Sequence, residues 1–306
     1  MNPKGAARLS IVAASTPDAM VDVPLGVRLH LGRAAAQTLA NASGIDLLHI
    51  KGDAVDPAVR PSGDPGSDID VMVRPDQVDV MDRVLRDHDW QLYTTFENGS
   101  PFGHAQTYLH ELWGYIDLHR RFPGIRLDPA EAFDRLWRAR GSIDFAGVAC
   151  PVPSVPAQSA ILLLNAARGR AGASFDVSRL WTDASTETRS TIESEVDALD
   201  ARLAWDAAVG DIERHRGDRE YRLWHAVSRG GTRAEEWWGR VLAQPTWGAR
   251  IAMMLRLLLV NVEHLALRLG HEPKRREIVA EFFARPLRGI RESFGQMVRR
   301  HATGRR

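Results

Sequence analysis

The sequence predicts an α+β fold in which a small mixed β-sheet with flanking helices, over residues 1–150, precedes an all-helical domain over residues 151–306. Two observations support this class. In the first half, short apolar runs with the two-residue alternation of strands are interleaved with helical patterns. After a proline-rich connector, apolar residues recur at helical spacing and no strand pattern follows; the connector contains Pro151, Pro153 and Pro156.

The first half begins with a helical pattern, since Leu29, Ala36 and Leu39 lie near helical spacing and Gly44 provides a stop. Two strand patterns follow, separated by a loop in which prolines and glycines interrupt any regular pattern. The predicted elements are a helix over 25–42, a strand over 45–50, a loop over 53–66, a strand over 68–73, a helix over 76–88, and strands over 91–95, 106–110 and 114–119, with a turn at 98–101.

The second half contains helical patterns throughout. Four consecutive apolar residues, Ile161 to Leu164, predict a buried helix over 157–168. Two further segments predict helices packed on the surface, and a long apolar stripe from Ile251 to Leu269 predicts another helix. The surface-packed helices are predicted over 190–209 and 233–243.

Size and composition exclude several classes of protein. The chain has 306 residues, of which 44% are hydrophobic and 26% charged, so it can bury a substantial core. A formal net charge of +1 does not indicate a partner that is a polyanion. The single cysteine, Cys150, excludes an internal disulfide and a cysteine-rich zinc site, so we expect a cytoplasmic protein. The most apolar stretch, 251–262, is short and contains Arg256, so no membrane span is expected.

Two aspartates separated by one apolar residue begin the second predicted strand, in Ser67-Asp68-Ile69-Asp70. Because side chains alternate along a strand, Asp68 and Asp70 share one face while Ile69 points into the core. Two residues along a strand span about 7 Å, a separation at which two carboxylates can hold a divalent metal ion between them. Magnesium prefers oxygen ligands and commonly shares them with the phosphates of a substrate.

A third acidic residue lies on a later predicted strand, in Ile116-Asp117-Leu118-His119. If this strand neighbours that of Asp68 and Asp70, Asp117 can join the metal site. Structural interpretations of the same residues stay open. Asp68 and Asp70 can cap a solvated strand edge, Asp117 can pair with an arginine three or four residues on, and His119 can be a hydrogen-bonded structural histidine; the arginines are Arg120 and Arg121.

Four motifs follow one another in the first half: Lys51-Gly52, a loop with Arg60, Ser67-Asp68-Ile69-Asp70 before an apolar strand, and Ile116-Asp117-Leu118-His119. Together they resemble the uncharacterised nucleotidyltransferase family of the DNA polymerase β-like superfamily. The segment Val152-Pro153-Ser154-Val155-Pro156 resembles that family's transition to its helical half. The resemblance covers residues 24 to 170, and the remainder is similar only in being helical.

The resemblance implies roles for individual residues. Asp68 and Asp70 would bind metal, and Asp117 would bind metal or act as the general base on the acceptor hydroxyl. Two Mg²⁺ ions would be the cofactors, as in two-metal phosphoryl transfer. The residues implied to contact the nucleotide are Lys51, Gly52, Arg60, Ser67 and His119.

Residue 53 departs from the pattern of the wider superfamily, which usually has Gly-Ser or Gly-Gly where this chain has Gly52-Asp53. A carboxylate here would repel a triphosphate unless it turns away or binds metal. Lys51 and Arg60 can neutralise phosphate charge, or they can form surface salt bridges. The acids available for such bridges are Asp53, Asp56 and Asp64.

The implied function is a metal-dependent nucleotidyltransferase, which moves a nucleoside monophosphate from a nucleoside triphosphate such as ATP to a hydroxyl or phosphate and releases pyrophosphate. The acceptor would be a small molecule, a peptide or a protein. One alternative is a non-catalytic nucleotide-binding or antitoxin-like module of the same fold, which Asp53 favours. Another is template-independent nucleotide addition to RNA through the arginine-rich residues 285–306. Nucleic acid and membranes are not the expected partners.

Overall fold

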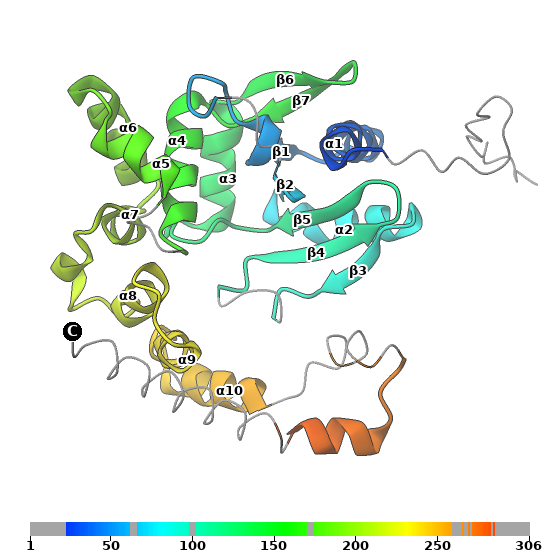
Figure 1. Cartoon of the computed structure of the whole chain (residues 1–306), viewed down its shortest axis with the longest axis vertical. Helices are drawn as coiled ribbons and strands as arrows, with labels where there is room; N and C mark the ends of the chain where they lie inside the picture. Colours follow the sequence, from blue (N-terminus) through cyan, green and yellow to red (C-terminus); the bar gives the residue numbers. More distant parts are fainter. Residues whose placement is uncertain are drawn as a thin grey trace, which may run out of the picture.

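The structure, a computed structural model, describes residues 23–61, 66–97, 102–169, 174–258 and 271–282, together with residues 265, 269 and 284. These residues form a five-stranded mixed sheet, a two-stranded hairpin and a helical region (Figure 1). The strands belong to the N-terminal half, and helices predominate in the C-terminal half. The predicted α+β class is therefore confirmed.

The main sheet has the strand order β1-β2-β5-β4-β3. Its central pair, β2 and β5, is parallel, and the remaining pairs are antiparallel. The register of the central pair places Asp70 beside Asp117 and Met72 beside His119. The strands are β1 (Leu47–His49), β2 (Asp68–Val73), β3 (Gln91–Thr94), β4 (Ala105–His110) and β5 (Gly114–His119).

The alternation of side chains gives the sheet two distinct buried faces. One face, which includes Ile69 and Ile116, packs against α1 (Leu25–Ala42) and α2 (Val78–Asp87). The other face, which includes Met72, packs in one hydrophobic cluster with α4 (Val155–Ala166). Because Asp70 and Asp117 alternate with the residues of the first face, they lie on the second face, which the helical half covers.

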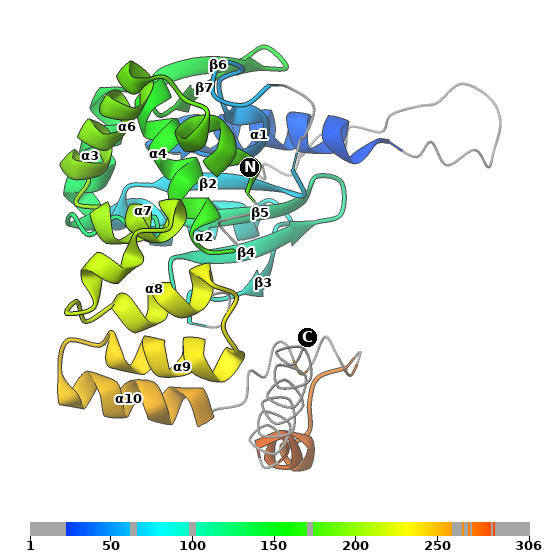
Figure 2. The ribbon, with the colours of Figure 1, turned by 60° about the vertical axis from the view of Figure 1, so that its left-hand side comes forward.

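The helical half extends the cluster that α4 begins. Ile192 of α6 and Leu203 of α7 are fully buried in that cluster, and so is Trp224 of α8. Figure 2 shows α8, α9 and α10 stacked in chain order below the sheet. The helices are α5 (Phe175–Val177), α6 (Thr186–Ala198), α7 (Arg202–Val209), α8 (Tyr221–Ser228), α9 (Arg233–Leu242) and α10 (Trp247–Leu258), and the turn Ser178–Thr182 follows α5.

Several elements differ from the prediction. The helix predicted over 190–209 is two helices, α6 and α7, because Asp200 adopts a left-handed conformation (φ 48°) between them. The helix predicted over 76–88 begins with a 3₁₀ turn, Pro75–Gln77.

The sequence interpretation missed helices α5 and α8 in the second half and three elements between residues 129 and 152. Helix α3 (Pro129–Arg138) begins where the Asp128 side chain accepts hydrogen bonds from two backbone N–H groups, a capping signal present in the sequence. Strands β6 (Gly141–Phe145) and β7 (Val148–Val152) form a hairpin whose two turn residues have positive φ, 51° at Ala146 and 81° at Gly147. Strand β7 crosses residue 150, where the domain boundary was placed, and the division into two domains stays a prediction.

No helix among the described residues is long and apolar enough to cross a membrane. Two sequence interpretations fall outside these residues, the turn at 98–101 and the role of the basic residues 285–306. The apolar stripe 251–269 is described as helix α10 as far as Leu258.

Candidate active site

An acidic cluster lies at the centre of the sheet face that the helical half covers. Asp70 of β2 and Asp117 of β5 are register partners, and His119 lies two residues farther along β5. The ligand atoms of these three residues lie within 4.8 Å of one another. Asp68, also on β2, lies two register pairs earlier, opposite Tyr115. The structure therefore brings the predicted site residues Asp70, Asp117 and His119 together, and Asp68 lies beside them on β2.

Asp70 is the most constrained carboxylate of the cluster, since only 4% of its surface is exposed. Its Oδ1 lies 2.6 Å from Lys51 Nζ and 2.9 Å from His119 Nε2. Burial alone would raise the pKa of Asp70, but the Lys51 ammonium and the hydrogen bond from His119 outweigh burial and hold that pKa well below its usual value. Asp70 is therefore an anion.

His119 is fully buried, and burial lowers the pKa of its imidazole despite the neighbouring Asp70. The ring is therefore neutral at pH 7, with the proton on Nε2, which donates to Asp70. Its Nδ1 has no hydrogen-bond partner among the described residues. His119 thus fixes one Asp70 oxygen in place and keeps a free lone pair.

The cluster carries more negative than positive charge. Burial, followed by repulsion from Asp70 and Asp117, raises the pKa of Asp68 to about 6, and the positive charge of Lys51 opposes the shift. The hydroxyl of Ser67 lies 3.4 Å from the Asp68 carboxylate. Such an excess of closely spaced carboxylate oxygens is the donor set that a hard divalent cation requires, so the residues present fit a metal ion such as Mg²⁺.

Asp117 receives a hydrogen bond of 2.6 Å from the hydroxyl of Thr107, its neighbour on β4. The alternative pairing with the following arginines is not found, because Arg120 donates to the carbonyl of Gly103 and Arg121 donates to that of Phe102. Asp117 therefore keeps a carboxylate oxygen for the site.

The two cations predicted to meet phosphate have different partners. Lys51 binds Asp70 inside the cluster, whereas Arg60 forms a two-point ion pair with the buried Asp176 of α5. The Arg60 pair joins the loop after β1 to the helical half, 116 residues farther along the chain. A direct phosphate contact by Arg60 would require that ion pair to open.

A tight turn follows Lys51 at the edge of the cluster. Gly52 has a φ of 64°, a left-handed conformation that favours glycine, and it opens the 3₁₀ turn Gly52–Ala54. A Cβ atom at Gly66 would lie 3.9 Å from the Cα of Gly52, so the two glycine turns are adjacent. Glycines in such turns allow the backbone to approach a ligand closely.

Arg33 of α1 is a site residue that the sequence interpretation missed. It is 1% exposed, and its Nη2 donates to the carbonyl oxygen of Lys51 at 3.3 Å. Burial lowers the pKa of Arg33, while attraction by nearby acids, first by Asp53, opposes the shift. Arg33 therefore supplies positive charge near the unusual Asp53 carboxylate, without an ion pair between them in the described residues. Its sequence signal is a single arginine within a run of small residues in the helix, Gly32-Arg33-Ala34-Ala35-Ala36.

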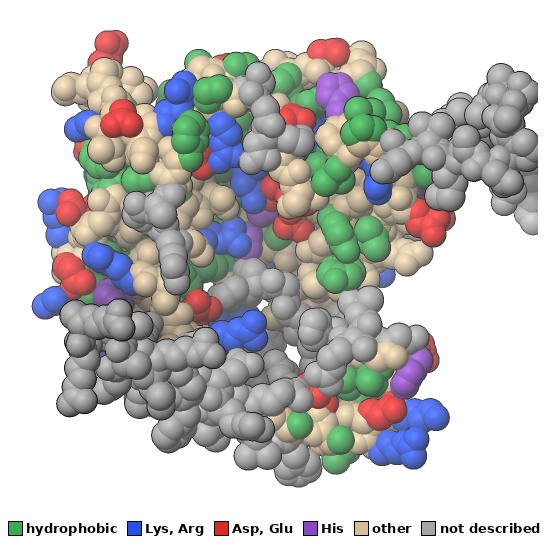
Figure 3. All heavy atoms as spheres, in the orientation of Figure 1, with side chains coloured by type: hydrophobic (Ala, Val, Ile, Leu, Met, Phe, Trp, Pro, Cys, Tyr) green, Lys and Arg blue, Asp and Glu red, His purple; other side chains and the backbone are tan. Residues whose placement is uncertain are grey.

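Two further residues beside the cluster come from outside the predicted motifs. Asp70 and Asp117 act electrostatically on Arg168, which follows α4. The ring of His104 lies 5.0 Å from that of His119, and burial lowers the pKa of His104. Figure 3 shows basic, acidic and histidine side chains gathered in the middle of one face of the molecule. Neither residue has a motif in the sequence, since the folding of α4 and β4 onto the central strands places them there.

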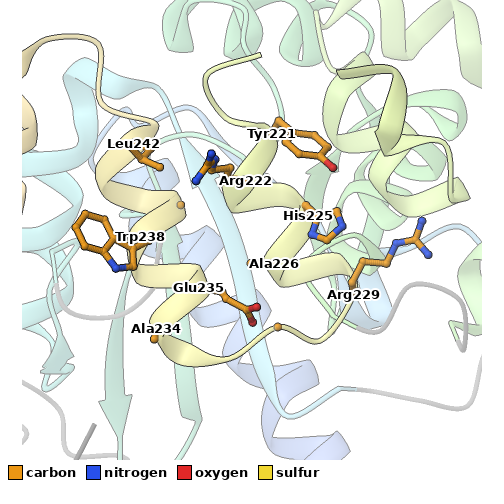
Figure 4. A pocket seen from close by; sticks show the side chains of 11 residues that line it. Tyr221, Arg222, His225, Ala226, Arg229, Ala234, Glu235, Trp238 and Leu242 are labelled. Atoms are coloured by element: carbon orange, nitrogen blue, oxygen red, sulfur yellow. The ribbon is translucent and has the colours of Figure 1, made fainter. Parts of the chain in front are cut away.

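A separate hollow of about 900 Å³ lies between α8 and α9. In Figure 4, Tyr221 and His225 reach it from α8, and Glu235 and Trp238 reach it from α9. None of the predicted site residues lines this hollow. Its residue types, aromatic and basic groups with a single acid, do not form a metal-binding set.

No family model and no curated protein matches this sequence at a significant level. Among solved structures, the chain is similar to the lincosamide antibiotic adenylyltransferase LnuA bound to lincomycin, at 16% identity and a TM-score of 0.32, with 54% of this chain and 92% of that chain covered. It is also similar to an antigenic nucleotidyltransferase-like protein from Paracoccidioides brasiliensis, at 18% identity and a TM-score of 0.34, with 60% and 93% covered.

Proposed function

We propose that this protein is a metal-dependent nucleotidyltransferase, which transfers a nucleoside monophosphate from a nucleoside triphosphate to a hydroxyl or phosphate of a small molecule, peptide or protein. The observation that carries the proposal is the register of β2 and β5, which sets Asp70 beside Asp117 with Asp68 on the same face. Lys51 and the Gly52 turn border this acidic centre. Carboxylates that bind metal beside a backbone turn that accepts phosphate are the parts that phosphoryl transfer requires.

Asp70 and Asp117 would hold the metal, with Asp68 as a further ligand. When bound, Mg²⁺ would neutralise charge on the transferring phosphate and on the leaving group. His119 holds Asp70 by its Nε2–H, and Thr107 holds Asp117 by its hydroxyl, so neither carboxylate needs to reorient when substrate arrives. Both contacts preorganise the site.

The reaction forms a bond between an oxygen of the acceptor and the α-phosphorus of the donor. It breaks the bond between that phosphorus and the oxygen bridging to the β-phosphorus, and pyrophosphate leaves with the electron pair. When the acceptor is a hydroxyl, its proton passes to a carboxylate, for which Asp117 is our candidate. The turn at Gly52 would bind the triphosphate through backbone N–H groups.

The contact between Arg33 and the 51–54 turn bears on the alternative of a non-catalytic module. Asp53 was the residue that favoured that alternative, because its charge would repel a triphosphate. In the structure, Arg33 lies beneath the turn and its charge attracts Asp53. The positive charge of Arg33 would lessen the repulsion between Asp53 and a triphosphate, which supports the catalytic proposal over the non-catalytic alternative.

The experiment that tests the proposal is mass spectrometry of candidate acceptors after incubation with Mg²⁺ and mixed nucleoside triphosphates. We expect an acceptor mass increased by one nucleoside monophosphate, and we expect the increase to disappear in Asp70→Asn. Asp79→Asn is the matched control, because Asp79 is exposed on α2, on the other side of the sheet. A mass increase that survives in Asp70→Asn would contradict the assigned role of Asp70.

A further inference from the structure

Arg168 lies where the helical half meets the acidic cluster. It follows α4, and its backbone N–H donates to the carbonyl of Asn165 in the last turn of that helix. Helix α4 packs against the sheet face that carries the cluster, since Ala160 and Ile161 belong to the same hydrophobic cluster as Met72 of β2. The packing of α4 therefore fixes the position of the Arg168 backbone.

The Arg168 guanidinium is partly buried and lies over the ring of Phe102, 5.8 Å from the ring centroid. Burial lowers its pKa, and Asp70 and Asp117 oppose that shift by attracting the charge. Its side chain has no hydrogen bond and no ion pair with the part of the chain that the structure describes. Desolvating a cation is costly unless an anion or hydrogen-bond acceptors compensate it.

Two other cations near the site are held by carboxylates, Arg60 by Asp176 and Lys51 by Asp70. Arg33 donates to the carbonyl of Lys51, and its Nε and Nη1 have no hydrogen-bond partner among the described residues. The ring of Phe102, over which Arg168 lies, is 6.4 Å from the ring of His104, which is 5.0 Å from that of His119 in the cluster. Arg168 is thus a guanidinium beside the acidic centre without a carboxylate of its own. A guanidinium binds phosphate through two parallel N–H···O bonds, so a phosphate chain that extends from the metal site would satisfy it.

We propose that Arg168 is a binding residue for the triphosphate of the donor nucleotide, contributed by the helical half. The proposal rests on the proposed function and deepens it, since it assigns a substrate contact outside the four motifs of the first half. It also gives the helical half a role in donor binding, because displacement of α4 from the sheet would remove this contact.

The test is isothermal titration calorimetry with inorganic tripolyphosphate and Mg²⁺, a probe that carries the phosphates without a base. We expect Arg168→Gln to bind the probe about 10- to 100-fold more weakly than the wild type, because a charge-assisted pair of hydrogen bonds is lost. Arg168→Lys should recover part of the loss through its charge. The control Arg83→Gln, an exposed arginine on α2 on the other side of the sheet, should bind like the wild type.

A merely structural role for Arg168 predicts a different pattern. Binding of Mn²⁺ alone should not weaken in Arg168→Gln, because the variant removes a positive charge near the metal site and leaves the carboxylates intact. Equal weakening of Mn²⁺ and tripolyphosphate binding would contradict the proposal and indicate a distorted site. If Arg168→Gln does not fold, Arg168→Met, which keeps the aliphatic stem over Phe102, takes its place in the same titrations.

The outcomes separate this proposal from the proposed function. If the wild type binds tripolyphosphate and Asp70→Asn does not, while Arg168→Gln binds as tightly as the wild type, Arg168 has no phosphate role and the transferase proposal stands. If the wild type does not bind tripolyphosphate with Mg²⁺ at all, both proposals are contradicted.

Discussion

Replacing Lys51 by methionine should lower the stability of the protein and raise its affinity for a divalent metal ion. Lys51 Nζ lies 2.6 Å from Asp70 Oδ1, and the two side chains are 16% and 5% exposed. At an effective dielectric constant of about 20, two unit charges at this distance attract by about 6 kcal/mol, of which desolvation cancels a part. Removing one partner of such a buried pair costs about 3–5 kcal/mol, so we expect Lys51→Met to lower the free energy of unfolding by about that amount.

The same substitution should strengthen binding of a divalent metal. The Lys51 ammonium holds Asp70 Oδ1, and a divalent metal ion would bind the same carboxylate, so the positive charge of Lys51 opposes metal binding. We therefore expect Mn²⁺ to bind Lys51→Met more tightly than the wild type, and saturating Mn²⁺ to restore part of the lost stability. Nucleotide transfer should nevertheless fall, because Lys51, once a metal ion displaces it from Asp70, would no longer be there to neutralise substrate phosphate.

Urea unfolding with and without Mn²⁺, together with a Mn²⁺ titration followed by electron paramagnetic resonance, measures both effects. Lys274→Met is the control, since Lys274 is exposed and lies outside the main sheet and the hydrophobic clusters. Unchanged stability of Lys51→Met, or Mn²⁺ binding weaker than in the wild type, would refute the reasoning.

Two further predictions concern buried groups near the 51–54 turn. Burial, with a contribution from the charge of Arg33, lowers the pKa of His49 to about 3, whereas an unfolded histidine titrates near 6.5. The unfolded chain thus binds a proton that the native chain does not, so His49 should lower the free energy of unfolding by about 1.4 kcal/mol per pH unit as pH falls below about 6.5. Urea unfolding at pH 7 and pH 5 measures this fall, which should be smaller in His49→Gln than in the wild type. An equal fall in the two proteins would contradict the prediction. Arg33→Met should weaken tripolyphosphate binding because it leaves the Asp53 charge uncompensated, and the double variant with Asp53→Asn should recover affinity. Additive effects of the two substitutions in calorimetry would show that Arg33 and Asp53 are not coupled.

The sequence predicted those helices and strands in which the spacing of apolar residues matches the side chains that are buried in the structure. Strand β2 begins with alternating acidic and apolar residues, and Ile69 and Val71 are buried against α1 and α2 as that alternation requires. Helix α1 has the predicted bounds, Leu25–Ala42. The hairpin β6–β7 was missed because its strands are short and Pro151 lies within β7, although the turn at Gly147 is a typical hairpin signal.

The parts of the site that sequence reasoning could not supply depend on contacts between distant segments. The alternation in two strands predicted that Asp70 and Asp117 share a face, and the parallel register places them side by side. By contrast, the partner of Arg60 lies 116 residues away, and no local pattern indicates that α5 packs against the loop after β1. Arg168 likewise reaches the cluster only because α4 covers the sheet.

The central claim is that Asp70 and Asp117 hold one divalent metal ion between them. Its most direct test is anomalous diffraction from crystals of the protein grown with Mn²⁺ and tripolyphosphate. We predict a Mn²⁺ peak bound by one oxygen of each carboxylate, at about 2.0–2.2 Å, with Lys51 moved away from Asp70. Crystals that bind Mn²⁺ elsewhere, or that keep Lys51 on Asp70 with no peak between the two strands, would contradict the account.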